Sequence, residues 1–292
     1  MQLPDPSPDA LFASRALESL IRQEISSNQN WISFARFMEL ALYTQNLGYY
    51  AGGAAKIGKG GDFTTAPEMT SLFGATLASF VASLNLPTPL RLMEFGAGSG
   101  KLAEDFLQAA RDIGLDVADY LIVELSSDLR DRQQQRLSHH VEVAWLDAPP
   151  SSFSGVVLCN EVLDAVPVPL VVRKNGRWLE RGVSFSGEQF VFVDRDVDQA
   201  ICHQIPDAAD LADGYLTEVH PRQEAFVSLL GEMLQAGKGG IAILIDYGFP
   251  AREYYLPQRS GGTLMCHYRH HAHTDPFRFL GLQDITAHVD FT

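Results

Sequence analysis

The stretch that decides the fold of this chain is Arg91-Leu92-Met93-Glu94-Phe95-Gly96-Ala97-Gly98-Ser99-Gly100. Its first five residues predict a buried strand, and its three alternating glycines then end that strand. Residues 101–113 carry apolar side chains at helical spacing and predict a helix that stops at Gly114. A strand, a glycine turn and a helix in this order open a doubly wound α/β domain. Glycine lets the backbone bend sharply, and free N–H groups at a helix start favour polar or anionic ligand groups.

Four further strands extend this unit into a sheet. Apolar runs predict buried strands at residues 120–124, 141–146, 155–159 and 241–245, and a helix around residues 226–234 precedes the last strand. Strands that alternate with helices form a parallel sheet. We therefore predict a Rossmann-like α/β fold.

The first 85 residues predict a helical region that carries a glycine-rich loop. Apolar spacing predicts one helix over residues 17–25, and Ser33 can cap a second helix. The end of the glycine-rich loop predicts a third helix start, with a capping box formed by Thr65 and Glu68. We expect the loop to fold over a cofactor as a lid, although an ordinary surface loop fits equally well. The helix after the loop shows one apolar face, formed by Met69, Leu72, Phe73, Leu77, Phe80 and Val81.

Residues 86–292 are expected to form the core domain, with a small β-rich insertion between the fourth and fifth strands. Asn175-Gly176 is a strong hairpin signal, and apolar runs lie on both sides of it. We predict a β-meander there, at about residues 168–218.

The composition narrows the class of protein. The 292 residues carry 22 basic and 36 acidic side chains, for a net charge of −14. Such a surface repels nucleic acid and suits a neutral or cationic partner, although it also serves plain solubility. No apolar run of membrane-spanning length occurs, and the acidic N-terminal region does not resemble a signal peptide.

The cysteines and histidines argue against a metal site. Three widely separated cysteines fit a reducing compartment and argue against structural zinc, so we expect a cytoplasmic protein. Four histidines cluster near the end of the chain, at His267, His270, His271 and His273. No carboxylate or cysteine pair completes an obvious site there, and we favour a polar loop.

The spacing of the three glycines distinguishes between two cofactors. A dinucleotide fingerprint, G-x-G-x-x-G, would place the third glycine one position later than Gly100, which disfavours a nicotinamide oxidoreductase. The observed G-x-G-x-G after Glu94 resembles motif I of class I S-adenosylmethionine-dependent methyltransferases. Glu124 ends the second strand, where a carboxylate can accept hydrogen bonds from both ribose hydroxyls. A surface glutamate at a strand end is the alternative interpretation.

Several motifs agree with one known family. They are 47–50 (LGYY), 61–68 (GDFTTAPE), 94–100 (EFGAGSG), Asn160-Glu161 with Asp164-Ala165, 245–248 (IDYG) and 284–291 (DITAHVDF). Together they resemble the MidA family of S-adenosylmethionine-dependent methyltransferases, whose mitochondrial members assist the assembly of respiratory complex I. The resemblance runs from about residue 10 to the last residue. Family members continue past the Asp290-Phe291 pair, so we expect C-terminal strands of the sheet to be missing from this chain.

The resemblance implies a class I methyltransferase fold, S-adenosyl-L-methionine as the cofactor, and methylation of arginine on a protein substrate. For mitochondrial members that substrate is a complex I subunit. Asp147 ends the third strand and could reach the adenine amino group, although a plain loop aspartate is an equally good interpretation. The expected cofactor-binding residues are Gly61, Thr64, Pro67, Glu94, Gly96, Gly98, Gly100, Glu124, Asp147 and Asn160.

The expected catalytic residues are Glu161, Asp164 and Asn160. An arginine acceptor has a pKa above about 12 and must lose a proton, which requires carboxylates facing it. These residues follow the fourth strand, at the sheet edge where ligands bind in this fold. In an alternative arrangement, Asp164 caps the following turn and only Glu161 meets substrate. A non-catalytic cofactor-binding assembly factor, which needs no Glu161, and a methyltransferase acting on a small molecule are the other functions considered.

Overall fold

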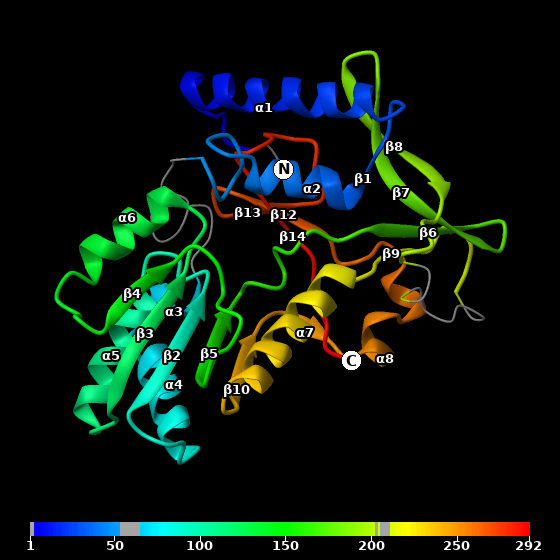
Figure 1. Cartoon of the computed structure of the whole chain (residues 1–292). Helices are drawn as coiled ribbons and strands as arrows, with labels where there is room; N and C mark the ends of the chain where they lie inside the picture. The colour runs from blue at the N-terminus through cyan, green and yellow to red at the C-terminus, as the bar shows by residue number, and fades with distance from the viewer. Residues whose placement is uncertain (1–2, 53–64, 202–203, 205–210) are drawn as a thin grey trace. The chain divides into compact units, whose positions relative to one another are not determined.

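The computed structural model describes residues 3–52, 65–201, 204 and 211–292 (Figure 1). These residues form two compact units. The first unit contains the described residues of Met1–Gly52, Leu163–Ala225 and Asp246–Thr292. The second unit contains those of Gly53–Val162 and Phe226–Ile245. This division differs from the expected boundary at residue 85, because segments far apart in the chain pack together in each unit.

The second unit is built on a parallel five-stranded sheet in the order β10-β5-β2-β3-β4. Its strands are β2 (Leu90–Phe95), β3 (Val117–Val123), β4 (Val143–Leu146), β5 (Gly155–Asn160) and β10 (Gly240–Ile245). Numbered within the sheet, the order is 3-2-1-4-5 read from β4, which is that of a Rossmann fold. The expected fold class is therefore confirmed. The order reverses between β2 and β5, and ligands bind at the carboxyl ends of the strands at such a point.

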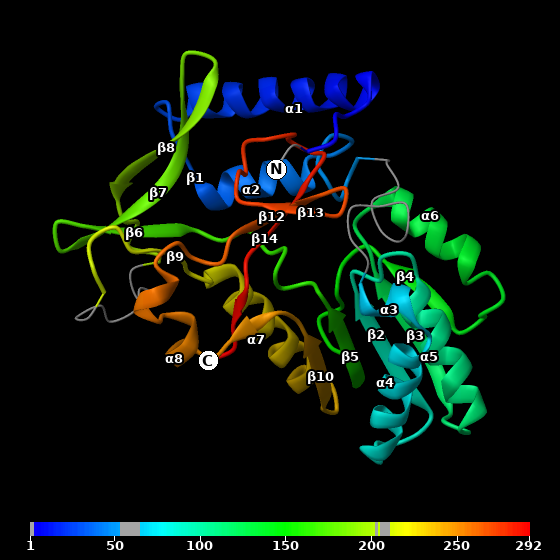
Figure 2. The ribbon, with the colours of Figure 1, turned by 180° about the vertical axis from the view of Figure 1, so that it is seen from behind.

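Helices cover both faces of this sheet (Figures 1 and 2). Alternate residues of β2 point to opposite faces, so Leu92 packs in one hydrophobic cluster and Met93 in the other. The cluster around Leu92 includes Phe106, and the cluster around Met93 includes Met233. The helices are α3 (Ala66–Met69), α4 (Leu72–Ser83), α5 (Lys101–Asp112), α6 (Ser127–Arg136) and α7 (Pro221–Ala236), of which α7 enters this unit at Phe226.

The apolar face expected after the glycine-rich loop is only partly correct. Two short helices, α3 and α4, replace one continuous helix, and the side chains of Met69 and Leu72 are 75% and 70% exposed. Leu77 and Val81 of the expected face are buried in one cluster with side chains of α5, and a small residue of α4 also contacts α5. A Cβ atom on Gly74 would lie 2.7 Å from the Cβ of Asp105, so the absence of a side chain lets the two helices approach closely.

The first unit combines helices with small sheets. Ser33 caps α2 as expected, because its hydroxyl oxygen accepts a hydrogen bond from the Arg36 N–H at 3.2 Å. The expected meander forms from β6, β7 and β8, and two further strands, β1 and β9, join it. The elements are α1 (Pro8–Ser27), β1 (Ile32–Ser33), α2 (Phe34–Tyr43), β6 (Leu170–Lys174), β7 (Arg177–Ser186), β8 (Gln189–Asp196) and β9 (Leu216–Glu218).

The last segment of the chain completes the first unit with short elements. They are β11 (Gly248–Phe249), α8 (Ala251–Tyr254), a 3-10 turn η2 (Pro257–Arg259), β12 (Met265–Tyr268), β13 (His271–His273), β14 (Asp284–Thr286) and β15 (Val289–Asp290). The strands β11 and β15 pair in parallel, and β12 lies between β13 and β14. No helix in the described part of the chain combines the length and apolar character needed to cross a bilayer.

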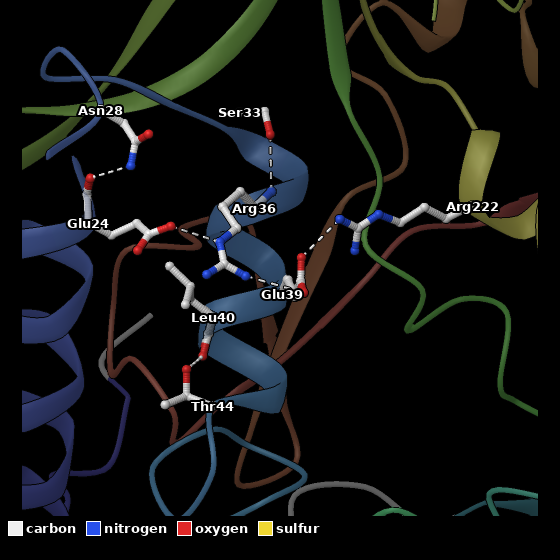
Figure 3. Close-up of polar contacts among 8 residues, drawn as sticks. All are labelled: Glu24, Asn28, Ser33, Arg36, Glu39, Leu40, Thr44 and Arg222. Carbon is white, nitrogen blue, oxygen red and sulfur yellow. Dashed lines mark hydrogen bonds and ion pairs between the residues drawn. The ribbon is translucent and has the colours of Figure 1, made fainter. Parts of the chain in front are cut away.

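A network of charged side chains links α1, α2 and the start of α7 in the first unit (Figure 3). Arg36 bonds Glu24 of α1 at 3.0 Å, and Glu39 of α2 pairs with Arg222 of α7 at 2.9 Å. These side chains are 32 to 46% exposed, so each pair contributes about 0–1 kcal/mol. Phe37 of α2 is fully buried against other aromatic rings, and removing it would cost roughly 3–5 kcal/mol. Apolar packing therefore holds α2 in place far more strongly than the ion pairs do.

Candidate functional site

The glycine turn after β2 adopts a conformation that favours glycine at each of its three positions. Gly96, Gly98 and Gly100 have φ angles of +63°, +54° and +81°. A Cβ atom on Gly96 would lie 3.3 Å from the side chain of Val162, and one on Gly100 would lie 3.3 Å from Leu137. The turn thus lies close to its neighbours, and Gly100 directly precedes α5 as its N-cap.

Glu94 lies at the end of β2 and is only 2% exposed. The Tyr120 hydroxyl donates a hydrogen bond to its carboxylate at 2.8 Å. Burial raises the pKa of Glu94 to about 7, against the lowering effect of this hydrogen bond, and the nearby charge of Glu124 adds to the rise. Glu94 therefore changes its charge near neutral pH.

Glu124 follows β3 directly and is largely buried. One carboxylate oxygen accepts the Ser126 N–H at 2.9 Å, and the other accepts the side-chain amide of Gln133 at 2.9 Å. Burial raises the pKa of Glu124, and hydrogen bonds from the Ser126 backbone, the Gln133 side chain and the Leu125 backbone oppose the rise. The contact of Glu124 with the ribose hydroxyls stays a prediction.

Gln133 joins these features, although the sequence reasoning did not single it out. Its side chain is fully buried in α6, and its amide nitrogen donates to the Gly98 carbonyl at 2.9 Å as well as to Glu124. Its amide oxygen accepts the Trp145 indole N–H at 2.9 Å. Gln133 is the first of three consecutive glutamines in a polar helix, so nothing in the local pattern marks it as buried.

The expected capping box at Thr65 does not form. The Thr65 side chain makes no capping hydrogen bond, and the Glu68 carboxylate instead accepts a hydrogen bond from the Ser99 hydroxyl in the glycine turn. A partner distant in the sequence has replaced the local one. Pro67 is buried at the start of α3, whereas Gly61 and Thr64 lie outside the described residues.

Asp147 follows β4 and points its carboxylate toward Arg130, at 2.8 Å. Its side chain is 92% exposed. Arg130 also donates to the backbone carbonyls of Glu124 and Leu146. Asp147 thus lies at the correct end of the sheet, and its contact with adenine stays a prediction.

Asn160 is the last residue of β5 and Glu161 follows it, at the edge where the glycine turn follows β2. Phe95 and Cys159 are partners in the register of these two neighbouring strands. Glu161 has a φ angle of +51°, and its N–H donates to the Ile245 carbonyl at 2.8 Å. A left-handed conformation is uncommon for a residue with a side chain, so its persistence here indicates a constraint.

Asp164 belongs to the first unit, together with residues of three other motifs. Its N–H donates to the carboxylate of Asp246 at 3.2 Å, and its carbonyl accepts the Ala287 N–H at 2.9 Å. In the same unit, the Tyr50 hydroxyl bonds the buried carboxylate of Asp284 at 3.0 Å. The motifs of residues 47–50, 164–165, 245–248 and 284–291 thus share contacts within this unit.

The clustered histidines lie on the β12–β13 hairpin and the turn between its strands. Burial lowers the pKa of His267 and of His273. Among the residues that the structure describes, no three histidine, cysteine, aspartate or glutamate side chains gather as ligands of one metal ion.

Comparisons with known proteins agree with a cofactor site of this kind. A family model described as S-adenosyl-L-methionine-dependent methyltransferase matches residues 72–292. Protein arginine methyltransferase NDUFAF7 homolog, mitochondrial, from Drosophila melanogaster is 28% identical, over 99% of this chain and 71% of its own length. Protein arginine methyltransferase NDUFAF7, mitochondrial, from Homo sapiens is 25% identical, over 89% of this chain and 64% of its own length. The chain thus spans 64 to 71% of these two relatives.

Two solved structures from Burkholderia thailandensis resemble the chain throughout. One, which contains S-adenosyl-homocysteine, is 48% identical with a TM-score of 0.92 and covers 99% of this chain and 77% of that chain. The other, a native crystal structure, is 47% identical with a TM-score of 0.89 and covers 99% of this chain and 76% of that chain.

Proposed function

Because the chain belongs to the family of S-adenosyl-L-methionine-dependent methyltransferases, we propose that it methylates an arginine side chain of a protein. The observation that carries this proposal is the strained backbone of Glu161, at the end of β5 beside the glycine turn. The names of the mitochondrial relatives support the choice of arginine. A subunit of respiratory complex I is the first acceptor to test, on the ground of the family resemblance.

The donor side of the site uses residues of the second unit. Glu124 accepts the ribose hydroxyls, and the glycine turn lets the backbone approach the cofactor with no Cβ atom between them. Gln133 keeps the turn and the carboxylate in one arrangement through its two donated hydrogen bonds. S-adenosyl-L-methionine, when bound, supplies a methyl group activated by its positively charged sulfur.

The acceptor side needs a carboxylate, because the guanidinium group carries a proton that must leave. Glu161 orients the guanidinium through charge-assisted hydrogen bonds and takes that proton as the nitrogen–methyl bond forms and the sulfur–methyl bond breaks. The proton then passes to solvent, which restores the carboxylate. Asn160 and Asp164, assigned from the sequence, stay part of this proposal. We also propose a bacterial cytoplasmic location, because the three widely separated cysteines fit a reducing compartment.

The test is mass spectrometry of proteins from a bacterial extract after incubation with this protein and methyl-labelled S-adenosyl-L-methionine. We expect the label on arginine, and we expect Glu161→Gln to keep cofactor affinity while transfer falls by about a hundredfold or more. Label found only on small molecules would favour a methyltransferase that acts on a small molecule. Cofactor binding by the wild-type protein without any methyl transfer would favour the non-catalytic assembly factor. Wild-type transfer by the Glu161→Gln variant would show that another group takes the proton.

A further inference from the structure

We infer that Asp246 is a positioning residue for the acceptor step, because its carboxylate binds the backbone N–H groups of Leu163 and Asp164. This inference rests on the proposed function. Asp246 directly follows β10, and its role comes from contacts within the first unit.

The carboxylate of Asp246 binds two consecutive backbone groups. Its Oδ2 atom accepts the N–H of Leu163 at 2.8 Å and the N–H of Asp164 at 3.2 Å. Its Oδ1 atom accepts the N–H of Tyr247 at 2.8 Å. Hydrogen bonds to an ionised acceptor are stronger than those between neutral groups. The two oxygens therefore tie residues 163 and 164 to the segment that follows β10.

The carbonyl groups of the same three residues are held by other segments. The buried side chain of Gln223 donates to the Leu163 carbonyl at 2.8 Å, and the Ala287 N–H donates to the Asp164 carbonyl at 2.9 Å. The Tyr43 hydroxyl donates to the Ala165 carbonyl at 2.9 Å. Five backbone groups of three consecutive residues are thus bound by segments far apart in the sequence.

Such dense anchoring is unusual for a connection between strands, which commonly lies on the surface and moves. A site that must place a carboxylate within about 0.5 Å of its working position needs this kind of support. Asp246 holds both N–H groups through one charged group. Asparagine has a single carboxamide oxygen, so it cannot accept the Leu163 and Asp164 N–H groups and the Tyr247 N–H in the same arrangement.

The test compares the wild-type protein with Asp246→Asn and Asp246→Ala. The matched control is Asp213→Asn, because Asp213 also accepts a backbone N–H in this unit, that of Gly176 at 3.0 Å, but at an exposed turn. Three quantities are measured: S-adenosylhomocysteine affinity, hydrogen exchange of the amides of residues 163 and 164, and single-turnover transfer of labelled methyl groups to extract protein.

We expect both Asp246 variants to keep S-adenosylhomocysteine affinity within about twofold, to exchange the two amides faster, and to lose transfer by roughly ten- to a hundredfold, with alanine the more severe. The control should match the wild-type chain in all three quantities. Wild-type transfer by the alanine variant would overturn the inference, as would a parallel loss of cofactor affinity in both variants. A wild-type chain that transfers no methyl group would instead overturn the proposed function, and this inference with it.

Discussion

At the scale of single residues, Glu94 shows how burial raises the pKa of a carboxyl group next to the proposed cofactor site. Its carboxyl group is shielded from water beside the Tyr120 hydroxyl, and burial raises its pKa to about 7. An unfolded chain ionises the same group at its ordinary value of 4.5. The folded state is therefore favoured below that value, and its advantage is lost as pH rises through 7.

We expect Glu94→Gln to remove this pH dependence, because glutamine resembles the neutral acid and still accepts the Tyr120 hydrogen bond. Between pH 4.5 and 7 the wild-type free energy of unfolding should fall by about 3 kcal/mol relative to the variant. Urea denaturation of both chains at pH 5 and pH 8 measures this difference. If the difference in the free energy of unfolding between the two proteins is the same at pH 5 and pH 8, Glu94 is ionised in the folded protein at both pH values.

A second prediction at this scale concerns Glu124. Replacing it by alanine removes hydrogen bonds to a charged acceptor, so S-adenosylhomocysteine affinity should fall roughly ten- to a hundredfold, as calorimetry can measure. The control is Glu142→Ala, which removes a carboxylate just before β4, at the opposite end of the sheet. Equal affinities for the two variants would assign the ribose contact to another residue.

At the scale of elements, α6 contacts two parts of the proposed cofactor site through one buried side chain, Gln133. We expect Gln133→Leu to weaken S-adenosylhomocysteine binding by about tenfold, because Gly98 and Glu124 each lose a donor that fixes them. The neighbouring Gln134 is exposed, so Gln134→Leu makes the same chemical change without touching the site. Calorimetry on both variants separates the two cases. Equal binding by the two variants would contradict a supporting role for α6.

How well each element could be predicted depended on how local its cause is. The strand before the glycine turn and the helix after it follow from apolar spacing and glycine conformation, and Ser33 caps α2 through a contact three residues away. The capping box failed because Glu68 binds Ser99, thirty-one residues along the chain. The role of Gln133 also escaped, since its burial depends on β3, β4 and the glycine turn together.

At the scale of the whole molecule, each compact unit is assembled from separate pieces of the chain. No local pattern indicates which pieces meet, and the expected boundary at residue 85 therefore followed the order of the chain instead. The sheet illustrates the consequence. Its strand β10 and the helix that covers Met93 and Val157 come from residues far beyond the other four strands.

We therefore expect a fragment of residues 53–162 not to fold cooperatively. It would leave β5 as an open edge and the apolar face around Met93 uncovered, which favours aggregation. Binding of a hydrophobic dye and the shape of the thermal transition measure this outcome. The control joins residues 226–245 to the fragment through a flexible linker. A sharp transition in the shorter fragment would contradict the prediction.

The left-handed backbone of Glu161 implies that one substitution at this position can raise thermostability and remove activity. A residue with a side chain gives up roughly 1 kcal/mol or more in this conformation, and glycine does not. Glu161→Gly should thus withstand heat and denaturant at least as well as the parent chain, while its methyl transfer is lost. Random mutagenesis screened for heat resistance alone would enrich this change, and a screen for turnover would eliminate it. If the Glu161→Gly variant melts several degrees below the parent protein, contacts of the Glu161 side chain stabilise the fold, and the conformation is not kept for activity alone.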